Sequence, residues 1–478
     1  MKSRPFDPHW TTELPSLAAY LDDLCRTIGE TETRGRKRKE AAQANFEAAI
    51  KAIVLDMFRA HLSDPSLHVG IGLHQNTLQH LSKFQYGSPI FTPTSFEQAV
   101  KALLTGGFIE QTANFRHDRS GKHSRTRRYQ ATPSLLCGVR DAGGSAAALI
   151  RHRGADGIRL KDADKNLVEY GDVPFAKAAG ERLRVINDML QCHWADLALT
   201  DEQLTTELRS IGEMRDDEAA QSFDFAARTV YRVFNNSDWE QGGRFYGAWW
   251  TSCPRRLRPY ILINSKRTVE VDYSGLHAAM LYALDGQAVP DDPYERCLTK
   301  ADDKAERKLV KQTFNALLNA DTIDRIGEID DYSAEITGHS WKDFKRYIVG
   351  KYPEFRQYFG SGVGLRLQRK DSDLAETVML RFEAMGYACL PVHDSFIVHH
   401  GLQDELDQIM REAFEAEFGV SGKVGVDIGI GEVVEKSDPP IEPNPDQLLN
   451  PVGYEARLQP FWDKRGTAED TDITPPLV

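Results

Sequence analysis

Thr268-Val269-Glu270-Val271-Asp272 and Tyr387-Ala388-Cys389-Leu390-Pro391-Val392-His393-Asp394-Ser395 are the two stretches of sequence that decide the fold. The first follows Ile261-Leu262-Ile263 and the turn residues Asn264-Ser265-Lys266, so it predicts the second strand of a β-hairpin. The second predicts a strand that enters a tight turn at His393-Asp394 and returns as a strand through His399. Each pattern places an aspartate where a buried strand ends.

Helical patterns surround these strands. Four segments after Asp272 have apolar residues at helical spacing; they are His277–Leu284, Ala301–Leu318, Asp371–Met385 and Gln403–Phe418. Residues 160 to 235 are predicted to be mostly helical, including Ala178–Leu199 and Asp216–Phe234. A further strand is predicted at Val424–Ile430. The combination predicts an α+β fold with an antiparallel sheet and packed helices.

The first 140 residues predict a helical, winged-helix-like unit. A helix is expected from 41 to 61, and a second helix, with Ser95 as its N-cap, ends at Gly106-Gly107. A strand at 108–112, a basic segment around Ser120-Gly121 and a returning strand at 127–132 follow. A winged helix has this order of elements, and so does an ordinary helix followed by a hairpin with a solvated, charged turn.

Basic residues gather between these two strands. They are Arg116, Arg119, Lys122, Arg125, Arg127 and Arg128. Such a cluster suits contacts with the phosphates of a duplex. Because the net charge of the chain is −12, nucleic-acid binding would depend on local patches of this kind rather than on the overall charge.

Composition narrows the class of protein. A chain of 478 residues, of which 41% are hydrophobic, suggests two to four domains with buried cores. The sequence has no apolar run of membrane-spanning length, and residues 1–20 lack the apolar stretch of a signal peptide. The six cysteines form no C-x-x-C pair, which argues against a zinc site or a disulfide framework. A soluble, cytoplasmic protein is expected.

The two strand-terminal aspartates suggest metal chemistry. Two carboxylates brought together from distant strands can hold two Mg²⁺ ions roughly 4 Å apart, with Mn²⁺ as an alternative. Between them in the sequence, Arg307 and Lys311 lie four residues apart on a predicted helix and share one face. Facing a triphosphate, this pair would neutralise the charge that develops on the leaving group. Either feature alone is common; their order along the chain favours phosphoryl-transfer chemistry.

Three motifs resemble those of family A DNA polymerases. Val271–His277 resembles the first palm motif, Asp-Tyr-Ser-Gln-x-Glu, and Arg307-x3-Lys311-x7-Asn319-Ala320 resembles the finger-helix motif, Arg-x3-Lys-x7-Tyr-Gly. Val392-His393-Asp394-Ser395 resembles the Val-His-Asp-Glu hairpin, and it is also similar to the His-Asp-Ser of single-subunit phage and mitochondrial RNA polymerases.

Two lesser elements extend this resemblance. Glu240–Arg244 resembles the Thr/Asp-x-x-Gly-Arg element, and Gln368 resembles the Gln that precedes the penultimate palm helix. The resemblance covers about residues 238 to 432, with the motifs in the family order. It implies a right-hand polymerase with a palm, short fingers and a helical thumb.

The resemblance also implies roles for individual residues. Asp272 and Asp394, with the backbone of Tyr273, would bind the metals, and Lys311 would protonate pyrophosphate. The expected nucleotide-binding residues are Arg307, Lys311, His277, Asn315 and Asn319. The expected nucleic-acid-binding residues are Arg244, Gln368 and His393, together with the basic residues of the N-terminal unit.

Three positions depart from the family pattern. His277 stands where family A has the Glu that excludes a 2′-hydroxyl, and by its size it can still block a ribose, which favours deoxynucleotides. Asn319 replaces the finger-helix Tyr and so removes an aromatic platform. Ser395 replaces an acid, as it does in the RNA polymerases.

The expected organisation and function follow from these observations. The expected domains are an N-terminal DNA-binding unit (1–140), a helical thumb-like region (141–237), a palm in two parts (238–300 and 366–434), fingers (301–365) and a Pro- and Asp-rich tail (435–478). The expected function is DNA-directed DNA synthesis on a primed template with dNTPs. An RNA polymerase or primase of the same superfamily is one alternative. A non-catalytic DNA-binding replication initiator or regulator is another.

Overall fold

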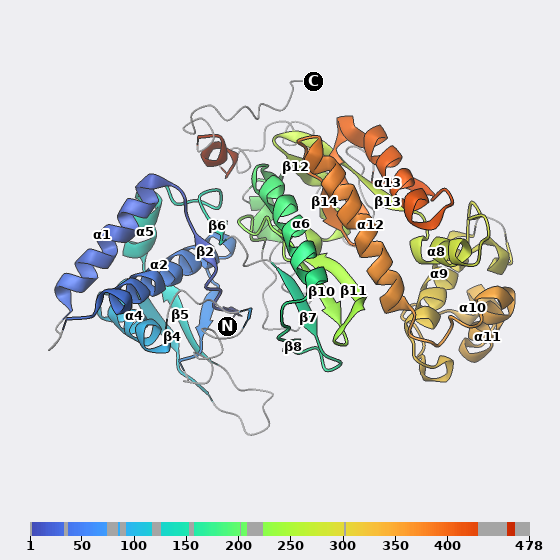
Figure 1. The fold of residues 1–478 in the computed structure, drawn as a ribbon, viewed down its shortest axis with the longest axis horizontal. Coiled ribbons are helices and arrows are strands. Elements are labelled where there is room, and N and C mark those ends of the chain that lie inside the picture. The colour runs from blue at the N-terminus through green and yellow to red at the C-terminus, as the bar shows by residue number, and fades with distance from the viewer. Residues whose placement is uncertain are drawn as a thin grey trace.

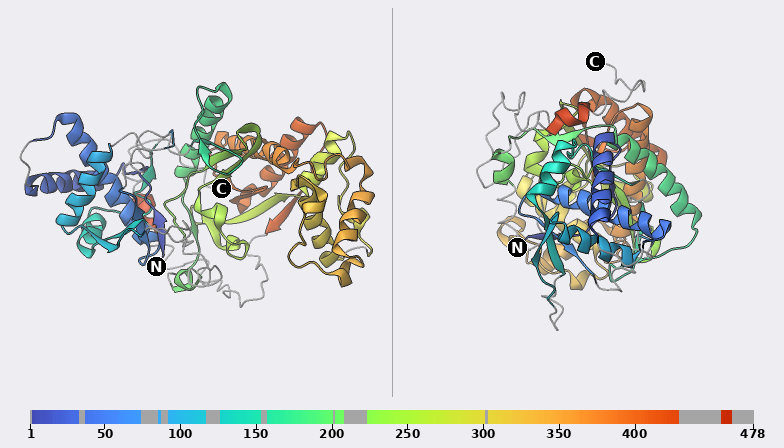
Figure 2. Two further views of the ribbon diagram at one scale, coloured as in Figure 1. Left: turned by 90° about the horizontal axis from the view of Figure 1, so that it is seen from below. Right: turned by 90° about the vertical axis from the view of Figure 1, so that its left-hand side faces the viewer.

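The computed structural model shows a mixed α+β protein with several small sheets, which confirms the α+β part of the expected fold (Figure 1). The described residues are 2–32, 37–73, 85–86, 92–116, 126–152, 157–200, 202–207, 223–300, 303–428 and 457–463. The N-terminal elements lie at one end of the molecule and residues 276–351 lie at the other, in both Figure 1 and the left view of Figure 2. In the described part of the chain, no helix is long and apolar enough to cross a membrane.

The N-terminal unit is a four-stranded sheet covered by helices. Its strands, in the order β1-β3-β5-β4, are β1 (Ser3–Pro5), β3 (His68–Ile71), β5 (Arg127–Ala131) and β4 (Ile109–Ala113). Its helices are α1 (Pro15–Thr31), α2 (Glu40–Ser63), α4 (Pro93–Thr105) and α5 (Pro133–Asp141). They share one apolar core, and the short strands β2 (Trp10–Thr11) and β6 (Ile150–Arg151) pair beside them.

The predicted order of elements in this unit is confirmed, with one correction. Helix α4 ends at Thr105, and Gly107 follows in the left-handed region with φ of 72°, before β4 and β5 form an antiparallel pair. The N-cap is Thr92 and not Ser95. Ser95 is the third helical residue, and it closes a capping box by exchanging hydrogen bonds with Thr92.

Residues 141–237 contain more strand than the sequence pattern predicted. The strands β7 (Ile158–Lys161), β8 (Leu167–Val168), β10 (Tyr231–Asn235) and β11 (Asp238–Tyr246) form a sheet in the order β11-β10-β7-β8. Helix α6 (Pro174–Gln191) ends before Leu199, because β9 (Ala195–Leu197) pairs with β12 (Ile261–Ile263).

The helix expected at Asp216–Phe234 is wrong where the structure describes it. Residues 223–230 are not helical, and Tyr231–Asn235 is strand β10. Strands β7 and β11 pair with its two edges, so tertiary pairing overrides the helical spacing of Val230, Val233 and Phe234. The described part of this region is therefore mixed and not mostly helical.

The second half of the chain is built on a sheet in the order β14-β15-β13-β12-β9, with β16 also paired to β13. Its further strands are β12 (Ile261–Ile263), β13 (Lys266–Tyr273), β14 (Leu390–Val392), β15 (Ser395–His399) and β16 (Val424–Ile428). Both predicted hairpins are confirmed. Asn264 and Ser265 form the first turn with φ of 50° and 67°, the left-handed values that a two-residue hairpin turn requires.

Helices pack around this sheet into a second core. They are α8 (Leu276–Leu284), α9 (Lys304–Asn319), α10 (Ala334–Thr337), α11 (Trp341–Lys351), α12 (Gly364–Ala384) and α13 (Gln403–Phe418). Short 3₁₀ turns occur at Trp249–Ser252, Arg255–Tyr260, Glu295–Cys297, Ile323–Arg325, Pro353–Phe355 and His400–Leu402. Helix α12 begins at Gly364 and not at Asp371, so Gln368 lies inside the helix and does not precede it.

Candidate active site

The two aspartates that were predicted from the strand patterns are neighbours in the structure. Asp272 lies near the end of β13, and Asp394 lies in the two-residue turn between β14 and β15. Asp272 pairs in register with Ser395 on β15, and the backbone nitrogen of Tyr273 lies 3.5 Å from the backbone oxygen of Asp394. The pairing of β13 with β15 therefore brings together two acids that are remote in the sequence.

A buried polar network supports the hairpin that carries Asp394. The Ser395 hydroxyl donates a 2.5 Å hydrogen bond to the carboxylate of Glu270, which also accepts one of 2.6 Å from Arg258. His393 takes a φ of 58° at the exposed tip of the hairpin. Because Ser395 and Glu270 are both almost fully buried, the turn is fixed from below and only its tip faces outward.

A cavity of about 250 Å³ opens beside Asp394. Seven of the residues predicted for the site line it: Arg244, His277, Lys311, Asn315, Asn319, Gln368 and Asp394. Gly275, Leu276 and Tyr294 also line it, and the sequence did not mark them as site residues. The cavity thus collects residues from β11, from the start of α8, from α9, from α12 and from the β14–β15 turn, which are far apart in the chain.

Helix α9 contributes one face to the cavity. Lys311, Asn315 and Asn319 follow one another at intervals of four residues, so they form a polar stripe along the helix. Asp303 caps the N-terminus of α9 by accepting hydrogen bonds from two backbone N–H groups of the first turn. Arg307 begins the same stripe, but it is bonded to Asp292 at 2.6 and 3.1 Å and does not line the cavity.

Arg244 reaches the cavity because two glycines let β11 lie close to α12. Gly242 and Gly243 have φ of 82° and 84°, and a Cβ on Gly243 would meet the Ser372 hydroxyl at 2.6 Å. The next residue, Arg244, donates a 2.8 Å hydrogen bond from Nε to one carboxylate oxygen of Asp371 and forms an ion pair with the same oxygen at 2.7 Å. The Gly-Gly-Arg element therefore places a guanidinium in the cavity, held by a partner on α12.

Asp371 is a component of the site that the sequence reasoning missed. It is 2% exposed, and its burial, reinforced by the charge of Asp394, raises its pKa to about 7 against the opposing effect of Arg244. The sequence did carry a signal. Asp371 lies among Leu367, Leu374 and Val378 on the apolar face of α12, where a carboxylate is unexpected without a partner.

His277 is neutral in this cavity at physiological pH. Burial, together with the nearby charges of Arg244 and Lys311, lowers its pKa to about 4, and Asp394 only partly opposes this effect. Its Nε2 atom is buried and has no hydrogen-bond partner among the residues that the structure describes. A neutral imidazole with an unsatisfied ring nitrogen is suited to meet a polar group of a ligand.

The acids at the cavity fit a divalent cation that shares its coordination with a ligand. Within the described ranges, no group of three or more His, Cys, Asp or Glu side chains is arranged to hold a metal on its own. Asp394 lines the cavity, whereas Asp272 does not line it but pairs in register with Ser395, the residue after Asp394. Mg²⁺ commonly takes only one or two carboxylates and completes its shell with water and phosphate oxygens, so this pair fits such an ion.

The basic segment of the N-terminal unit is only partly described. Arg119, Lys122 and Arg125 lie outside the described residues, whereas Arg116 and Arg127 are exposed. Arg128 is 4% exposed on β5, and this burial argues against the expected phosphate contact by its side chain. Arg127 is the first residue of β5, whereas Arg128 lies within the strand between β3 and β4, next to Tyr129, which is also buried.

Comparison with known proteins adds no family assignment. No protein-family model matches the chain, and no curated protein sequence matches it either. The motifs and the geometry of the cavity are therefore the observations that bear on function.

Proposed function

We propose that the chain is a compact template-directed nucleotidyltransferase that extends a primer with deoxynucleoside triphosphates on a DNA template. The observation that carries this proposal is the meeting of Asp272 and Asp394 at one edge of the β13–β15 pair, beside a polar cavity that contains Lys311. Two neighbouring carboxylates, one of which lines a cavity together with a cation, are the groups that phosphoryl transfer requires. Five motifs in the order of family A polymerases support the same conclusion.

The residues of the chain have distinct tasks in this reaction. Asp272 and Asp394 would hold two Mg²⁺ ions, which would lower the pKa of the primer 3′-hydroxyl and stabilise the departing pyrophosphate. The ammonium group of Lys311 would bind the triphosphate and transfer a proton to the leaving pyrophosphate. Neutral His277 would lie against the sugar without adding a charge next to the phosphates.

Arg307 and Arg244 have partners in the structure that bear on their tasks. Arg307 would leave Asp292, or share it, to reach the triphosphate, since Lys311 lies one helical turn further along the same face. Arg244 would contact the primer–template duplex while Asp371 holds its guanidinium in place. Gln368, Asn315 and Asn319 would complete the polar lining around the nucleotide.

A primer-extension assay with purified full-length protein tests the proposal. Wild type with Mg²⁺ should extend a primed DNA template with dNTPs, whereas Asp272→Asn and Asp394→Asn should each lower the rate by more than a thousandfold while template binding stays nearly unchanged. A matched control is Asp291→Asn, because Asp291 is an exposed acid that pairs with Lys423, and neither residue lines the cavity. Loss of template binding in the Asp394 variant would indicate a structural role for that residue.

An RNA polymerase or primase is the second candidate, because Asp394-Ser395 has the order found in the single-subunit RNA polymerases. Separate pools of NTPs and dNTPs, each on primed and unprimed templates, distinguish the two reactions. Wild-type protein that is inactive with every pool and template would favour the third hypothesis, a non-catalytic DNA-binding initiator or regulator.

A further inference from the structure

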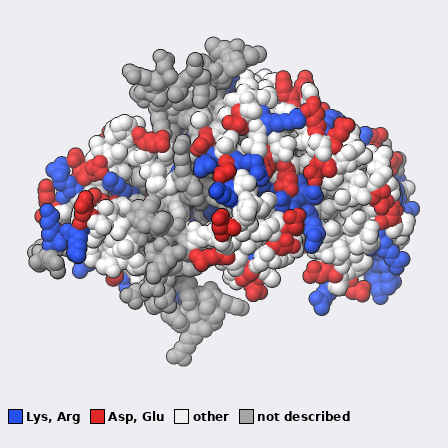
Figure 3. Space-filling view, in the orientation of Figure 1, with Lys and Arg blue, Asp and Glu red and all other residues white. Residues whose placement is uncertain are grey.

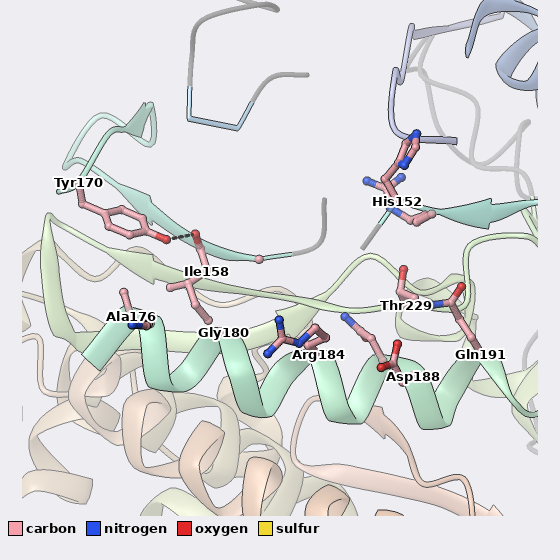
Figure 4. Close-up of a pocket in the computed structure, with 13 residues that line it drawn as sticks. His152, Ile158, Tyr170, Ala176, Gly180, Arg184, Asp188, Gln191 and Thr229 are labelled. Atoms are coloured by element: carbon pink, nitrogen blue, oxygen red, sulfur yellow. Dashed lines mark hydrogen bonds between the residues drawn. The ribbon is translucent and has the colours of Figure 1, made fainter. Parts of the chain in front are cut away.

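A second cavity, of about 500 Å³, lies along helix α6, away from the candidate active site. Its lining comes from one face of α6 and from residues outside that helix, among them His152, Ile158, Tyr170 and Thr229 (Figure 4). We call this cavity the α6 groove. Figure 1 places α6 between the N-terminal helices and α12, and α12 carries Gln368 and Asp371 of the candidate active site.

Two cations of the α6 groove have no partner among the residues that the structure describes. Lys177 and Arg184 are exposed, and neither makes an ion pair or a side-chain hydrogen bond with any residue in the described ranges. They lie seven residues apart, which is two helical turns or about 10 Å along one face of α6. Basic side chains gather at the centre of the face shown in Figure 3, where Figure 1 places α6.

Other residues of the groove are held in place by hydrogen bonds and an ion pair, and the groove has open space at Gly180. Gly180 lies between the two cations, and a Cβ there would meet no atom within 4 Å, so the floor of the groove is open. The Asn187 side chain is fixed by two 2.8 Å hydrogen bonds with the backbone of Val230. Arg151 is held by Asp7 at 2.5 Å, and Asp188 contributes one negative charge.

We propose that the α6 groove binds the sugar–phosphate backbone of a nucleic-acid strand that runs between the N-terminal unit and the candidate active site. Two exposed cations on one helix face, neither of them paired within the described ranges, complement the phosphates of a strand. The chain as a whole carries a net charge of −12, so a cationic groove in this position is not a consequence of general basicity. This proposal rests on the proposed function, because it assigns a contact surface for the nucleic acid. Its test measures binding alone and does not require catalysis.

Fluorescence anisotropy with labelled single-stranded and duplex oligonucleotides tests the α6 groove. The double variant Lys177→Ala/Arg184→Ala should bind at least tenfold more weakly. The slope of log K against log salt should become shallower by about 1.4 for a single strand or about 1.8 for a duplex. The charge-matched control, Lys342→Ala/Arg346→Ala on the exposed side of α11, should bind as the wild type does.

Each outcome of this test has a definite meaning. Weaker binding of only one of the two oligonucleotides identifies that form as the occupant. Unchanged affinity and slope for both, or an equal loss in the control, would overturn the proposal. If wild-type protein binds oligonucleotides through these residues but extends no primer, the polymerase proposal fails and the α6 groove stands.

Tyr294 supports a second inference, which does not depend on the α6 groove but rests on the proposed function. It lines the candidate active-site cavity with His277, Lys311 and Asp394, although its side chain is almost fully buried. Burial raises the pKa of its hydroxyl, and the nearby acids reinforce this effect against Arg307, so the group is neutral and able to donate a hydrogen bond at physiological pH.

Tyr294 occupies space that a glycine leaves open. Gly275 has a φ of 62°, and a Cβ on it would meet Pro293 Cγ at 2.9 Å and the Tyr294 ring at 3.4 Å. Family A polymerases have Gln at the position of Gly275, so a long side chain there is replaced by a ring that arrives from the loop before α9. The same chain has Asn319 where the family has its finger-helix Tyr.

The loop that carries Tyr294 is firmly held. The Tyr294 N–H donates to Asp292, the Tyr352 hydroxyl donates a 2.6 Å bond to the carbonyl of Pro293, and the Tyr294 ring meets Phe314 edge-on at 5.6 Å. Asp292 also accepts both hydrogen bonds from Arg307, whose guanidinium lies 5.4 Å from the Tyr294 ring. A ring held on this many sides is preorganised to contact a ligand.

The geometry points to Tyr294 as a nucleotide-binding residue whose hydroxyl meets the sugar of the incoming nucleotide opposite His277. It would take over the aromatic role that Asn319 cannot perform. Two substitutions separate its ring from its hydroxyl: Tyr294→Phe removes the hydroxyl alone, and Tyr294→Leu removes the ring as well. The control is Tyr347→Phe, because the hydroxyl of Tyr347 donates to the Cys297 carbonyl outside the cavity.

Steady-state extension and calorimetric binding of Mg·dATP and Mg·ATP measure the effect. Tyr294→Phe should raise KM about tenfold for one or both sugars and change the dNTP-to-NTP preference, with kcat reduced much less and thermal stability close to that of the control. Unchanged KM and unchanged sugar preference would overturn the inference. Nucleotide binding by wild type that is altered in Tyr294→Phe, without extension by either protein, would sustain the site and reject the polymerase.

Discussion

Protonation of His277 should oppose folding, and the structure gives the size of this effect. An unfolded histidine has a pKa near 6.5, whereas burial together with Arg244 and Lys311 lowers the pKa of His277 to about 4 in the fold. The contribution of His277 to stability is therefore fully present above pH 6.5. It is lost as the pH falls from 6.5 towards 4, because the unfolded chain then binds a proton that the folded chain does not.

The expected magnitude follows from these two pKa values. Between pH 7 and pH 5, His277 alone should cost up to roughly 2 kcal/mol of unfolding free energy. His277→Gln keeps a neutral polar side chain in the cavity, so this variant should lose less stability than wild type between the same two pH values. The difference between the two proteins isolates the imidazole from the other titrating groups.

Two measurements check the prediction. Histidine-selective ¹³C labelling, with the resonance assigned by its disappearance in His277→Gln, should give a titration midpoint well below pH 5.5. Urea unfolding at pH 7 and pH 5 should show the smaller loss in the variant. A midpoint near 6.5, or equal losses of stability in both proteins, would refute the burial argument and with it the neutral imidazole assigned to the nucleotide cavity.

Three further outcomes are expected. Gly275→Ala should destabilise the fold by about 1–3 kcal/mol in thermal unfolding, because a left-handed residue would gain a Cβ 2.9 Å from Pro293; a neutral effect would contradict the close approach. Replacing exposed Arg116 and Arg127 by Ala should weaken duplex binding and make its salt slope shallower by about 1.8. Arg128→Ala should instead lower thermal stability with little change in that slope, because its side chain is buried.

The sequence predicted the sheet that carries the acids because its signals were local. The alternating residues of β13 and the turn formers Asn264 and Ser265 specify a hairpin without help from the rest of the chain. Helix α13 begins and ends at the residues its apolar spacing predicted. The roles of the motif residues were instead predicted from their resemblance to a family pattern, and not from a physical rule.

The errors arose where distant partners decide the local structure. Residues 231–235 have helical spacing, but β7 and β11 supply hydrogen bonds on both edges and a strand results. Asp371 becomes part of the site only because α12 packs against β11, where Arg244 bonds to it. Tyr294 becomes part of the site only because the loop before α9 packs against Gly275. The spacing of residues within one helix or strand does not predict contacts with distant elements. The sequence did show that Asp371 is an acid on the apolar face of α12.

The buried state of Ser395 bears on the choice between DNA and RNA synthesis. Its hydroxyl is bonded to Glu270, which in turn is held by Arg258, so the serine serves the packing behind the hairpin. A residue held in this way does not face the sugar of a nucleotide, so the likeness to the RNA polymerases at Ser395 is one of sequence and not of a sugar contact. If the chain is a polymerase, its preference between dNTP and NTP must be set by groups that line the cavity. His277 and Tyr294 are the candidates, because both bring a neutral ring into the cavity beside Asp394.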